Sequence, residues 1–481
     1  MTPTSSSNAP VVQSDPRRPQ LRLARLLDDG SVVRLHDDDE LAVVAVRGRI
    51  GGADVFAFCT DAGKKGGALG LAECLRIART VDAAAAEGWP VIGLWHSGGA
   101  RLTDGVEAMH GMAQVFAAIV RASGKVPQLS VVLGPAAGGA AYGPALTDLV
   151  ITAPDARIFI TGPDVVRGVT GEVISMEDLG GPDAHARKSG VNHVAAVSEA
   201  DAYARVHHLL GLLTRRGSFD PSAPGHPGNP GALLPLSPQR AYDVHPVIRS
   251  ILDRGGESFQ ELQAKWAPNI VVGLGRLGGA TVGTVANNPL RKGGCLDSLS
   301  AEKAARFVRM CDALAIPLLV LVDVPGFLPG VGQEWGGVVR RGAKLLYAFA
   351  EASVPRVTLV MRKSYGGAYI AMNCRALGAT EVFAWPQAEV AVMGPEAAVE
   401  VLHRKRLAAA DVTGRAALRT ELVEEQRRTA GGVARALELG VIDEVIDPAH
   451  TRARLIAAFA ATWRPAFDPA RSEAAHGNIP L

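Results

Sequence analysis

A short glycine turn occurs twice in this chain, and the repetition constrains the fold more than any other feature. The first copy is Gly138-Gly139-Ala140-Ala141-Tyr142 and the second is Gly366-Gly367-Ala368-Tyr369. Further downstream, Thr161–Val166 is echoed by Met393–Ala398. Both pairs lie roughly 230 residues apart, which is the length of a domain and far longer than a solenoid repeat. The sequence therefore predicts two copies of one domain, each with one such turn.

Each turn follows an apolar run that is typical of a buried strand, Gln128–Leu133 in the first copy and Val357–Met361 in the second. A helix is expected to begin at the glycine pair. Because glycine has no Cβ atom, the backbone there can approach a ligand closely. The first N–H groups of the helix have no acceptor within it and lie at the positive end of its dipole. Such groups can stabilise an oxyanion, so we predict one anion-stabilising turn in each half.

Strand-like runs alternate with amphipathic helices in both halves, which predicts an α/β fold built from parallel βαβ-type units. A chain of 481 residues is long enough for two or three domains. Prolines punctuate residues 221–238, so the linker is expected there. The predicted organisation is an N-terminal tail (1–20), a first domain (21–225), a linker (226–240), a second domain (241–468) and a C-terminal tail (469–481). We expect the chain beyond Pro465 to be poorly ordered.

Composition narrows the possible partners. The net charge of +2 argues against a nucleic acid or a membrane surface held by bulk charge. No apolar run in the sequence reaches membrane-spanning length. The five cysteines are scattered and never form Cys-x-x-Cys, which favours reduced thiols and gives no sign of a metal site. We therefore expect a cytoplasmic protein without a bound metal.

Common catalytic motifs are missing from the sequence, including the phosphate-binding loop, His-Glu-x-x-His and Gly-x-Ser-x-Gly. His96, which precedes a loop, and Asp323, which ends an apolar strand, could contact a ligand or serve only the local structure. Two anion-stabilising turns without an obvious side-chain base suggest that the substrates supply the acid–base chemistry. Such turns could stabilise a thioester enolate and an anion on a second reactant.

Five motifs follow one another along the chain. They are Trp95–Arg101, Gly134–Ala140, Asn287–Pro289, Asp323–Phe327 and Arg362–Tyr369. Together they resemble the carboxyltransferase (β) subunits of biotin-dependent acyl-CoA carboxylases. The closest likeness is to the actinobacterial acetyl-/propionyl-CoA carboxylase β chain of the shorter type, and it runs from about Arg22 to the C-terminus.

The resemblance implies a crotonase-like ββα-superhelix fold in each half. The N-terminal half is expected to bind acyl-CoA, and its turn to hold the thioester oxygen as the enolate forms. The C-terminal half is expected to bind carboxybiotin, and its turn to hold the ureido oxygen of biotin. Carboxybiotin then releases CO2 and biotin removes the α-proton, which agrees with the missing side-chain base. The residues implied to be catalytic are Gly138, Gly139, Ala140, Gly366, Gly367 and Ala368.

The resemblance also implies a set of substrate contacts. They are Gly98, Gly99, Ala100, Arg101, Tyr142, Phe327, Tyr365 and Ile370. Ile370 stands where relatives often carry Asp, and it is expected near the acyl group of a short substrate such as acetyl-CoA or propionyl-CoA. The family assembles as a homohexamer, with each site formed between the N-half of one chain and the C-half of another.

The biotin itself is expected on a partner. The chain has no Met-Lys-Met attachment motif and no ATP-grasp-like region, so a biotinylated α subunit must supply carboxybiotin. The product would be malonyl-CoA or methylmalonyl-CoA for lipid synthesis. Two alternatives stay open. One is a decarboxylase or transcarboxylase subunit that uses the same site in the opposite direction, and the other is a catalytically silent assembly subunit.

Overall fold

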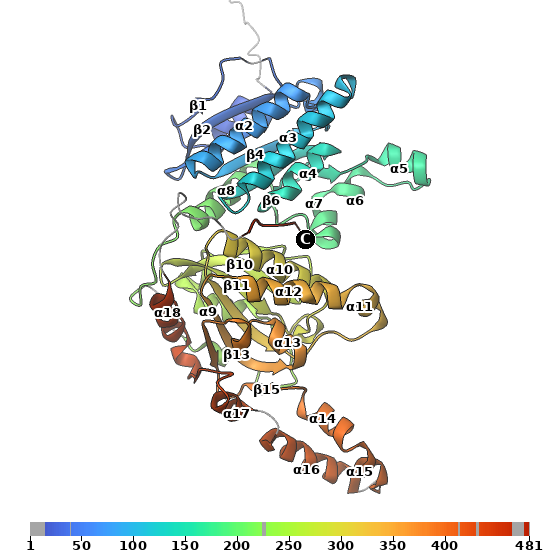
Figure 1. Ribbon diagram of the computed structural model, residues 1–481, viewed down its shortest axis with the longest axis vertical. Coiled ribbons are helices and arrows are strands. Elements are labelled where there is room, and N and C mark those ends of the chain that lie inside the picture. Colours follow the sequence, from blue (N-terminus) through green and yellow to red (C-terminus); the bar gives the residue numbers. More distant parts are fainter. Residues whose placement is uncertain are drawn as a thin grey trace, which may run out of the picture.

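The computed structural model describes residues 15–38, 40–223, 228–411, 414–429, 432–463 and 476–480. Two mixed β-sheets of eight strands each organise these residues, and each sheet carries its own helices (Figure 1). We call the part up to residue 223 the N-half and the part from residue 228 the C-half. The predicted α/β fold is confirmed, whereas the exact domain boundaries stay predictions.

The described part of the N-half contains eight strands and eight α-helices. In chain order they are α1 (Pro19–Leu26), β1 (Val33–Arg34), β2 (Val43–Ile50), β3 (Ala53–Thr60), α2 (Leu71–Glu87), β4 (Val91–Ser97), α3 (Val106–Ala122), β5 (Gln128–Ala137), α4 (Gly139–Leu146), β6 (Leu149–Thr152), β7 (Arg157–Phe159), α5 (Pro163–Thr170), α6 (Met176–Gly180), α7 (Pro182–Ala184), β8 (Val194–Ala195) and α8 (Glu199–Thr214).

The described part of the C-half follows a similar plan. Its elements are α9 (His245–Ile251), β9 (Gln260–Leu262), β10 (Ile270–Leu277), β11 (Ala280–Asn287), α10 (Ser298–Ala313), β12 (Leu318–Val324), α11 (Val331–Trp335), α12 (Val338–Glu351), β13 (Arg356–Tyr365), α13 (Gly366–Ala371), β14 (Glu381–Ala384), β15 (Glu389–Ala391), α14 (Pro395–Leu402), α15 (Arg404–Ala409), α16 (Gly414–Thr429), α17 (Val433–Glu438), β16 (Glu444–Val445) and α18 (Thr451–Thr462).

Sheet topology confirms the duplication. The first sheet has the order β1-β2-β3-β4-β5-β6-β8 with β7 on β5, and the second has β16-β14-β13-β12-β11-β10-β9 with β15 on β13. In each sheet an antiparallel hairpin, β2–β3 or β10–β11, leads into parallel strands. Short strands β7 and β15 extend β5 and β13 at the ends from which the glycine turns leave. Ligands of parallel sheets bind at such carboxyl ends.

The two halves share a hydrophobic core. One buried cluster joins Leu209 and Leu213 of α8 to Leu262, Ile270 and other side chains of the second sheet. Helix α10 is buried on almost every side because it lies between the halves. Its Lys303 is fully buried, and the Nζ atom donates to the carbonyl oxygens of three residues of the C-half at 2.9–3.0 Å. Burial lowers the pKa of Lys303 to about 8.

The C-terminal end differs from the prediction. A poorly ordered end was expected beyond Pro465, but residues 476–480 lie between the two halves, beside the label that marks the C-terminus in Figure 1. Asn478 is 2% exposed and its side chain donates to Asp148 of the N-half. The prediction is therefore wrong for these five residues. Residues 464–475 and 481 lie outside the described part.

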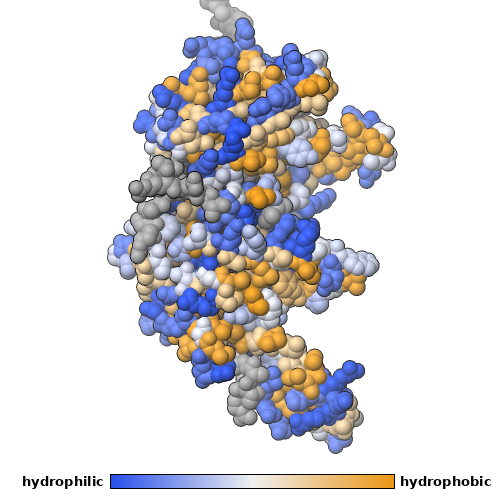
Figure 2. All heavy atoms as spheres, viewed as in Figure 1, coloured by the Kyte–Doolittle hydropathy of each residue, from blue (hydrophilic) through white to orange (hydrophobic). Residues whose placement is uncertain are grey.

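Two helical arms project from the same side of the molecule (Figure 1). The first arm consists of α5 and α6, and the second of α14, α15 and α16. The surface is hollowed between them, and apolar side chains lie on both (Figure 2). Val169 of the first arm and Val401 of the second are among the exposed hydrophobic residues. Among the described residues, no helix combines the length and the apolar character needed to cross a bilayer.

Candidate active site

The N-half turn joins β5 directly to α4. Gly138 has φ 56° and ψ −125°, a conformation that favours glycine. Its N–H donates to the carbonyl oxygen of Phe159 at 3.0 Å, which ties the turn to β7. Among the described residues, no atom accepts a hydrogen bond from the N–H group of Gly139 or of Ala140. These two groups belong to the first turn of α4 and could donate to an anion bound there, which stays a prediction.

The C-half turn repeats this arrangement between β13 and α13. Gly366 has φ 61°, and a Cβ atom there would lie 2.9 Å from the carbonyl oxygen of Val392. The N–H groups of Gly367 and Ala368 likewise lack an acceptor among the described residues. A Cβ atom on Gly367 would meet no atom within 4 Å. The space beyond this turn is a cavity of about 460 Å³.

That cavity is mostly apolar. Its lining comes from the turn, from β15 and the residue after it, and from α17 and the segment that follows. The lining includes Gly366, Gly367, Ile370, Val390, Val392, Arg435, Leu439 and Val441. Ile370 is 44% exposed and lies among these residues. A flat heterocycle with one carbonyl group would meet both apolar walls and unpaired N–H donors here.

A third loop in each half, which the sequence analysis missed, packs against the end of β4 or of β12. Lys65-Gly66-Gly67 in the N-half and Lys292-Gly293-Gly294 in the C-half have matching left-handed backbones. A Cβ atom on Gly67 would lie 2.2 Å from the oxygen of His96, and one on Gly294 would lie 2.6 Å from the oxygen of Asp323. The signal was available, because these loops are separated by almost the same number of residues as the two glycine turns.

The predicted contact loop Gly98–Arg101 lies against the N-half turn. Gly99 has φ 96°, and a Cβ atom on it would lie 2.6 Å from the oxygen of Ala137. The N–H of Arg101 donates to the oxygen of Leu69 at 2.8 Å. In the C-half, Leu328 makes the same bond to Leu296 at 2.7 Å. Residues 98–101 and 325–328 are therefore equivalent positions.

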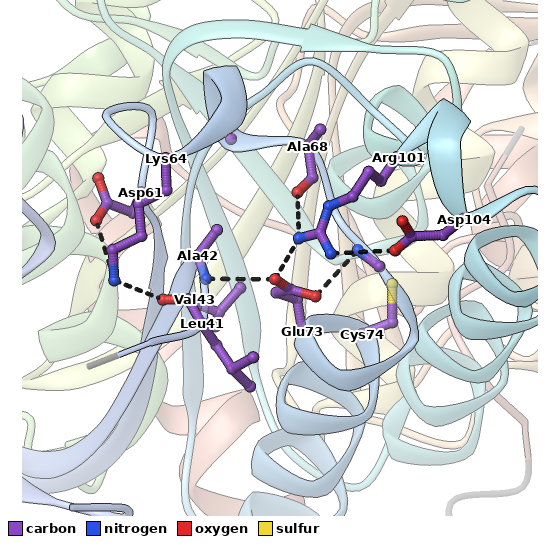
Figure 3. Close-up of polar contacts among 12 residues, drawn as sticks. Leu41, Ala42, Val43, Asp61, Lys64, Ala68, Glu73, Cys74, Arg101 and Asp104 are labelled. Atoms are coloured by element: carbon purple, nitrogen blue, oxygen red, sulfur yellow. Dashed lines mark hydrogen bonds and ion pairs between the residues drawn. The ribbon is translucent and has the colours of Figure 1, made fainter. Parts of the chain in front are cut away.

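Arg101 is held by internal ion pairs (Figure 3). Its guanidinium pairs with Glu73 of α2 and with Asp104 at 3.0 Å, and it donates to the oxygen of Ala68 at 3.3 Å. Burial acts to raise the pKa of Glu73, but the Arg101 hydrogen bond and charge outweigh it and lower that pKa. The side chain of Arg101 thus links the loop Gly98–Arg101 to the N-terminal end of α2.

The aromatic candidates lie in different settings. Tyr142 is half exposed on α4 and packs edge-on against Phe116. Phe327 packs against α12, close to Gly342. Tyr365 is 6% exposed, and its hydroxyl bonds to Glu389 of β15. This last bond joins the residue before the C-half turn to the short strand beside it.

His96 and Asp323, the two undecided candidates, occupy equivalent positions and both are engaged inside the protein. The His96 Nδ1 atom lies 3.4 Å from the Arg22 guanidinium, and burial followed by the Arg22 charge lowers the pKa of His96 to about 4. Asp323 is 1% exposed and accepts from Arg362 at 2.8 Å. Burial raises its pKa despite the opposing charge of Arg362. Within the described residues, no three His, Cys, Asp or Glu side chains are grouped as metal ligands.

The chain resembles known proteins over almost its whole length. The model of the carboxyl transferase domain matches residues 34–479. The β6 subunit of the biotin-dependent acetyl-/propionyl-coenzyme A carboxylase of Mycobacterium tuberculosis (strain ATCC 25618 / H37Rv) is 59% identical over 468 residues, covering 97% of each chain. The propionyl-CoA carboxylase beta chain of Rhodococcus erythropolis is 58% identical over 435 residues, covering 89% of this chain and 91% of that one.

A solved structure also shares the fold. The transcarboxylase 12S hexamer, with hydrolysed methylmalonyl-coenzyme A bound, superimposes with a TM-score of 0.88 at 40% sequence identity. The match covers 96% of this chain and 93% of that one. The resemblance seen in the sequence motifs is thereby confirmed, and so is the crotonase-like carboxyltransferase fold.

Proposed function

The chain belongs to the carboxyl transferase domain family and is the carboxyltransferase subunit of a biotin-dependent acyl-CoA carboxylase, and from this premise we propose that its two glycine turns are the catalytic groups. The observation that carries the proposal is the pair of strand-to-helix turns with unpaired N–H donors, one in each half. Donors fixed in the folded protein stabilise developing charge without rearranging during the reaction.

The N-half turn acts on the acyl-CoA. The N–H groups of Gly139 and Ala140 bind the thioester oxygen and become better partners as negative charge builds on it. Preferential stabilisation of that charged state lowers the barrier to loss of the α-proton. Tyr142 and the loop Gly98–Arg101 line the approach to this turn, and Arg101 keeps the loop in place through Glu73.

The C-half turn receives biotin from a partner subunit. The residues fit a ureido ring, since the cavity walls are apolar and the N–H groups of Gly367 and Ala368 lack other acceptors. Carboxybiotin, when bound, supplies the carboxyl group and the base for the α-proton. The chain's own part is to orient the ring and to donate to its ureido oxygen.

A short acyl group is the proposed substrate. The relatives named above are acetyl-/propionyl- and propionyl-CoA carboxylase subunits, and Ile370 offers an apolar contact beside the C-half turn. A small apolar acyl group fits such a contact better than a polar or charged one. We therefore propose acetyl-CoA and propionyl-CoA, carboxylated to malonyl-CoA and methylmalonyl-CoA.

The assembly is proposed to be a homohexamer with a biotinylated α subunit as its partner. The solved 12S relative is a hexamer. Helices α5, α11 and α14 project on the hollowed side of this molecule (Figure 1). They contain the exposed residues Val169, Trp335 and Val401, which a second copy would cover. In such a pair the N-half turn of one protomer would meet the C-half turn of the other. We infer a cytoplasmic location from the five unpaired cysteines.

A transcarboxylase role is the second candidate, because the 12S structure belongs to a transcarboxylase. Co-purification of the native partner separates the two. A biotin carboxylase partner supports the carboxylase, and a second carboxyltransferase supports the transcarboxylase. A catalytically silent subunit would bind no acyl-CoA in calorimetry.

The deciding assay combines the chain with its biotinylated partner, ATP and bicarbonate, and measures malonyl-CoA and methylmalonyl-CoA by mass spectrometry. Formation of either product, dependent on this chain, is the expected result. Absence of both with a partner shown to be carboxylated would contradict the proposal.

A further inference from the structure

The five residues His476–Pro480, called the C-terminal segment below, lie between the N-half and the C-half (Figure 1). On the N-half side, the N–H of Asn478 donates to the Ser123 hydroxyl at 2.9 Å. The Asn478 side chain donates to Asp148 Oδ1 at 2.8 Å. Asn478 and Asp148 are each 2% exposed, so the bond between their side chains is shielded from water.

The C-half holds the other end of the segment. The Nε2 atom of His476 lies 2.9 Å from Asp312 Oδ2 and 3.6 Å from Glu351. The Arg309 guanidinium donates to the Gly477 oxygen at 3.5 Å. These partners lie on α10 and α12, so the segment joins α10 and α12 of the C-half to the N-half.

The contact on the N-half side falls at a particular place. Asp148 comes two residues after α4, and its other carboxylate oxygen accepts from the N–H of Gln128, the first residue of β5, at 2.9 Å. One carboxylate thus ties together the start of β5, the end of α4 and Asn478. The glycine turn is the opposite end of this β5–α4 unit. Arg306 of α10 also holds the end of α4, because its guanidinium donates to the backbone oxygen of Thr147 at 3.0 Å.

We propose that the C-terminal segment is a positioning element for the N-half turn, acting through the Asn478–Asp148 bond. It fixes the β5–α4 unit against α10, and so sets where the N–H groups of Gly139 and Ala140 point. Asn478 is a positioning residue because it acts through Asp148 and not on the substrate. This inference rests on the proposed role of the N-half turn.

The first test removes the bond within the full complex. Asn478→Ala, assayed with the biotinylated partner, is expected to lower kcat about tenfold, a fraction of the effect of losing a whole oxyanion donor. KM for acyl-CoA should change little, since the misplaced donors act mainly on the charged state. Ile479→Ala is the matched control, because Ile479 is 59% exposed in the same segment. Equal kcat in Asn478→Ala and wild type would overturn the proposal.

The second test restores the bond. Asp148→Asn combined with Asn478→Asp re-creates an amide–carboxylate pair with the donor and acceptor exchanged, while the amide oxygen introduced at position 148 can still accept from the Gln128 N–H. The double variant is expected to recover most of the kcat that each single variant loses. A double variant no better than the singles contradicts a specific pairing.

Peptide complementation provides a third, independent readout. A chain ending at residue 475 should regain kcat when a synthetic peptide of residues 476–481 is added, in a saturable manner. The same peptide with Asn478→Ala should not restore it. Failure of the wild-type complex to form product would refute the proposed function, whereas an active wild type with a fully active truncated chain refutes only the positioning role.

Discussion

The two halves share one topology but surround their turns differently. In the N-half, a Cβ atom on Gly139 would lie 2.9 Å from Met112, so packed side chains stand behind the turn. In the C-half, Gly367 faces open space and a cavity. The residue before the turn is Ala137 in the first case and Tyr365, bonded to Glu389, in the second. Both halves kept the backbone donors, whereas the surroundings of the two turns diverged.

The loops beside the turns diverged in the same way. Arg101 and Glu73 form an ion pair in the N-half, while the equivalent positions in the C-half carry Leu328 and Ser300. Ser300 takes part in the N-terminal cap of α10 with Asp297. One fold position is thus stabilised by the Arg101–Glu73 ion pair in the N-half and by the Asp297–Ser300 cap in the C-half.

Blocking the C-half turn should have the largest effect. The valine side chain of Gly367→Val would enter the cavity beside the turn and keep a ligand away from the N–H donors. We expect kcat to fall about 100-fold or more, which is the usual cost of losing an oxyanion donor. The melting temperature should stay close to wild type. Gly139→Val is the matched change in the N-half, and it should reduce stability as well because Met112 must move. Equal losses of stability in both variants would show that the two turns do not differ in how tightly their surroundings are packed.

Replacing the ion pair tests the loops. Arg101→Leu copies the C-half residue but leaves the buried Glu73 carboxylate without its partner, which should lower the free energy of unfolding by about 3 kcal/mol. Adding Glu73→Ser removes the unpaired carboxylate and should recover part of that loss, because Gly70 at the start of α2 has no side chain to act as Asp297 does in the C-half. Denaturant unfolding measures both values. A double variant as unstable as the single would show that the two loops are not interchangeable.

Removing the bond behind the C-half turn should have a smaller effect. Tyr365→Phe deletes the hydroxyl that binds Glu389, and a hydrogen bond to a charged group contributes about 1.5–3 kcal/mol. Because the aromatic ring stays in place, we expect only a several-fold loss of kcat. KM for acyl-CoA should not change. A raised KM for acyl-CoA would show that the substitution disturbs the N-half turn and not the C-half turn.

The smallest effect concerns pH. The pKa of His96 is lowered from 6.5 to about 4 in the folded protein, so between these values the unfolded chain binds a proton that the folded chain does not. Folding stability should therefore fall as the pH drops through this range. His96→Asn should flatten that part of the profile, as measured by melting temperature from pH 7 to pH 4. An unchanged profile would show that His96 does not cause the loss.

Local sequence patterns predicted the turns well. Glycine pairs between an apolar strand and a helix determine their own backbone geometry, so Gly138 and Gly366 could be placed from the sequence alone. The repeat spacing also predicted two equivalent sheets. The same spacing applied to Lys65-Gly66-Gly67 and Lys292-Gly293-Gly294 would have revealed the third loop.

Long-range contacts could not be predicted in this way. Nothing near Arg101 in the sequence shows that Glu73, on α2, holds its guanidinium. Asn478 looks like part of a polar tail, and only the folded chain brings it to Asp148. The shared core around α8 and α10 is hidden for the same reason, since each helix alone looks like an ordinary amphipathic helix.

The central claim is that the backbone N–H groups of the N-half turn polarise the thioester. Isotope-edited infrared spectroscopy of propionyl-CoA labelled with carbon-13 at its carbonyl tests this directly in the complex. We predict that the carbonyl band moves to lower frequency on binding to wild type and to Gly367→Val, and that Gly139→Val abolishes this movement. A band that does not move on wild type, or a shift that depends on Gly367 and not on Gly139, would show that the N-half turn does not polarise the thioester.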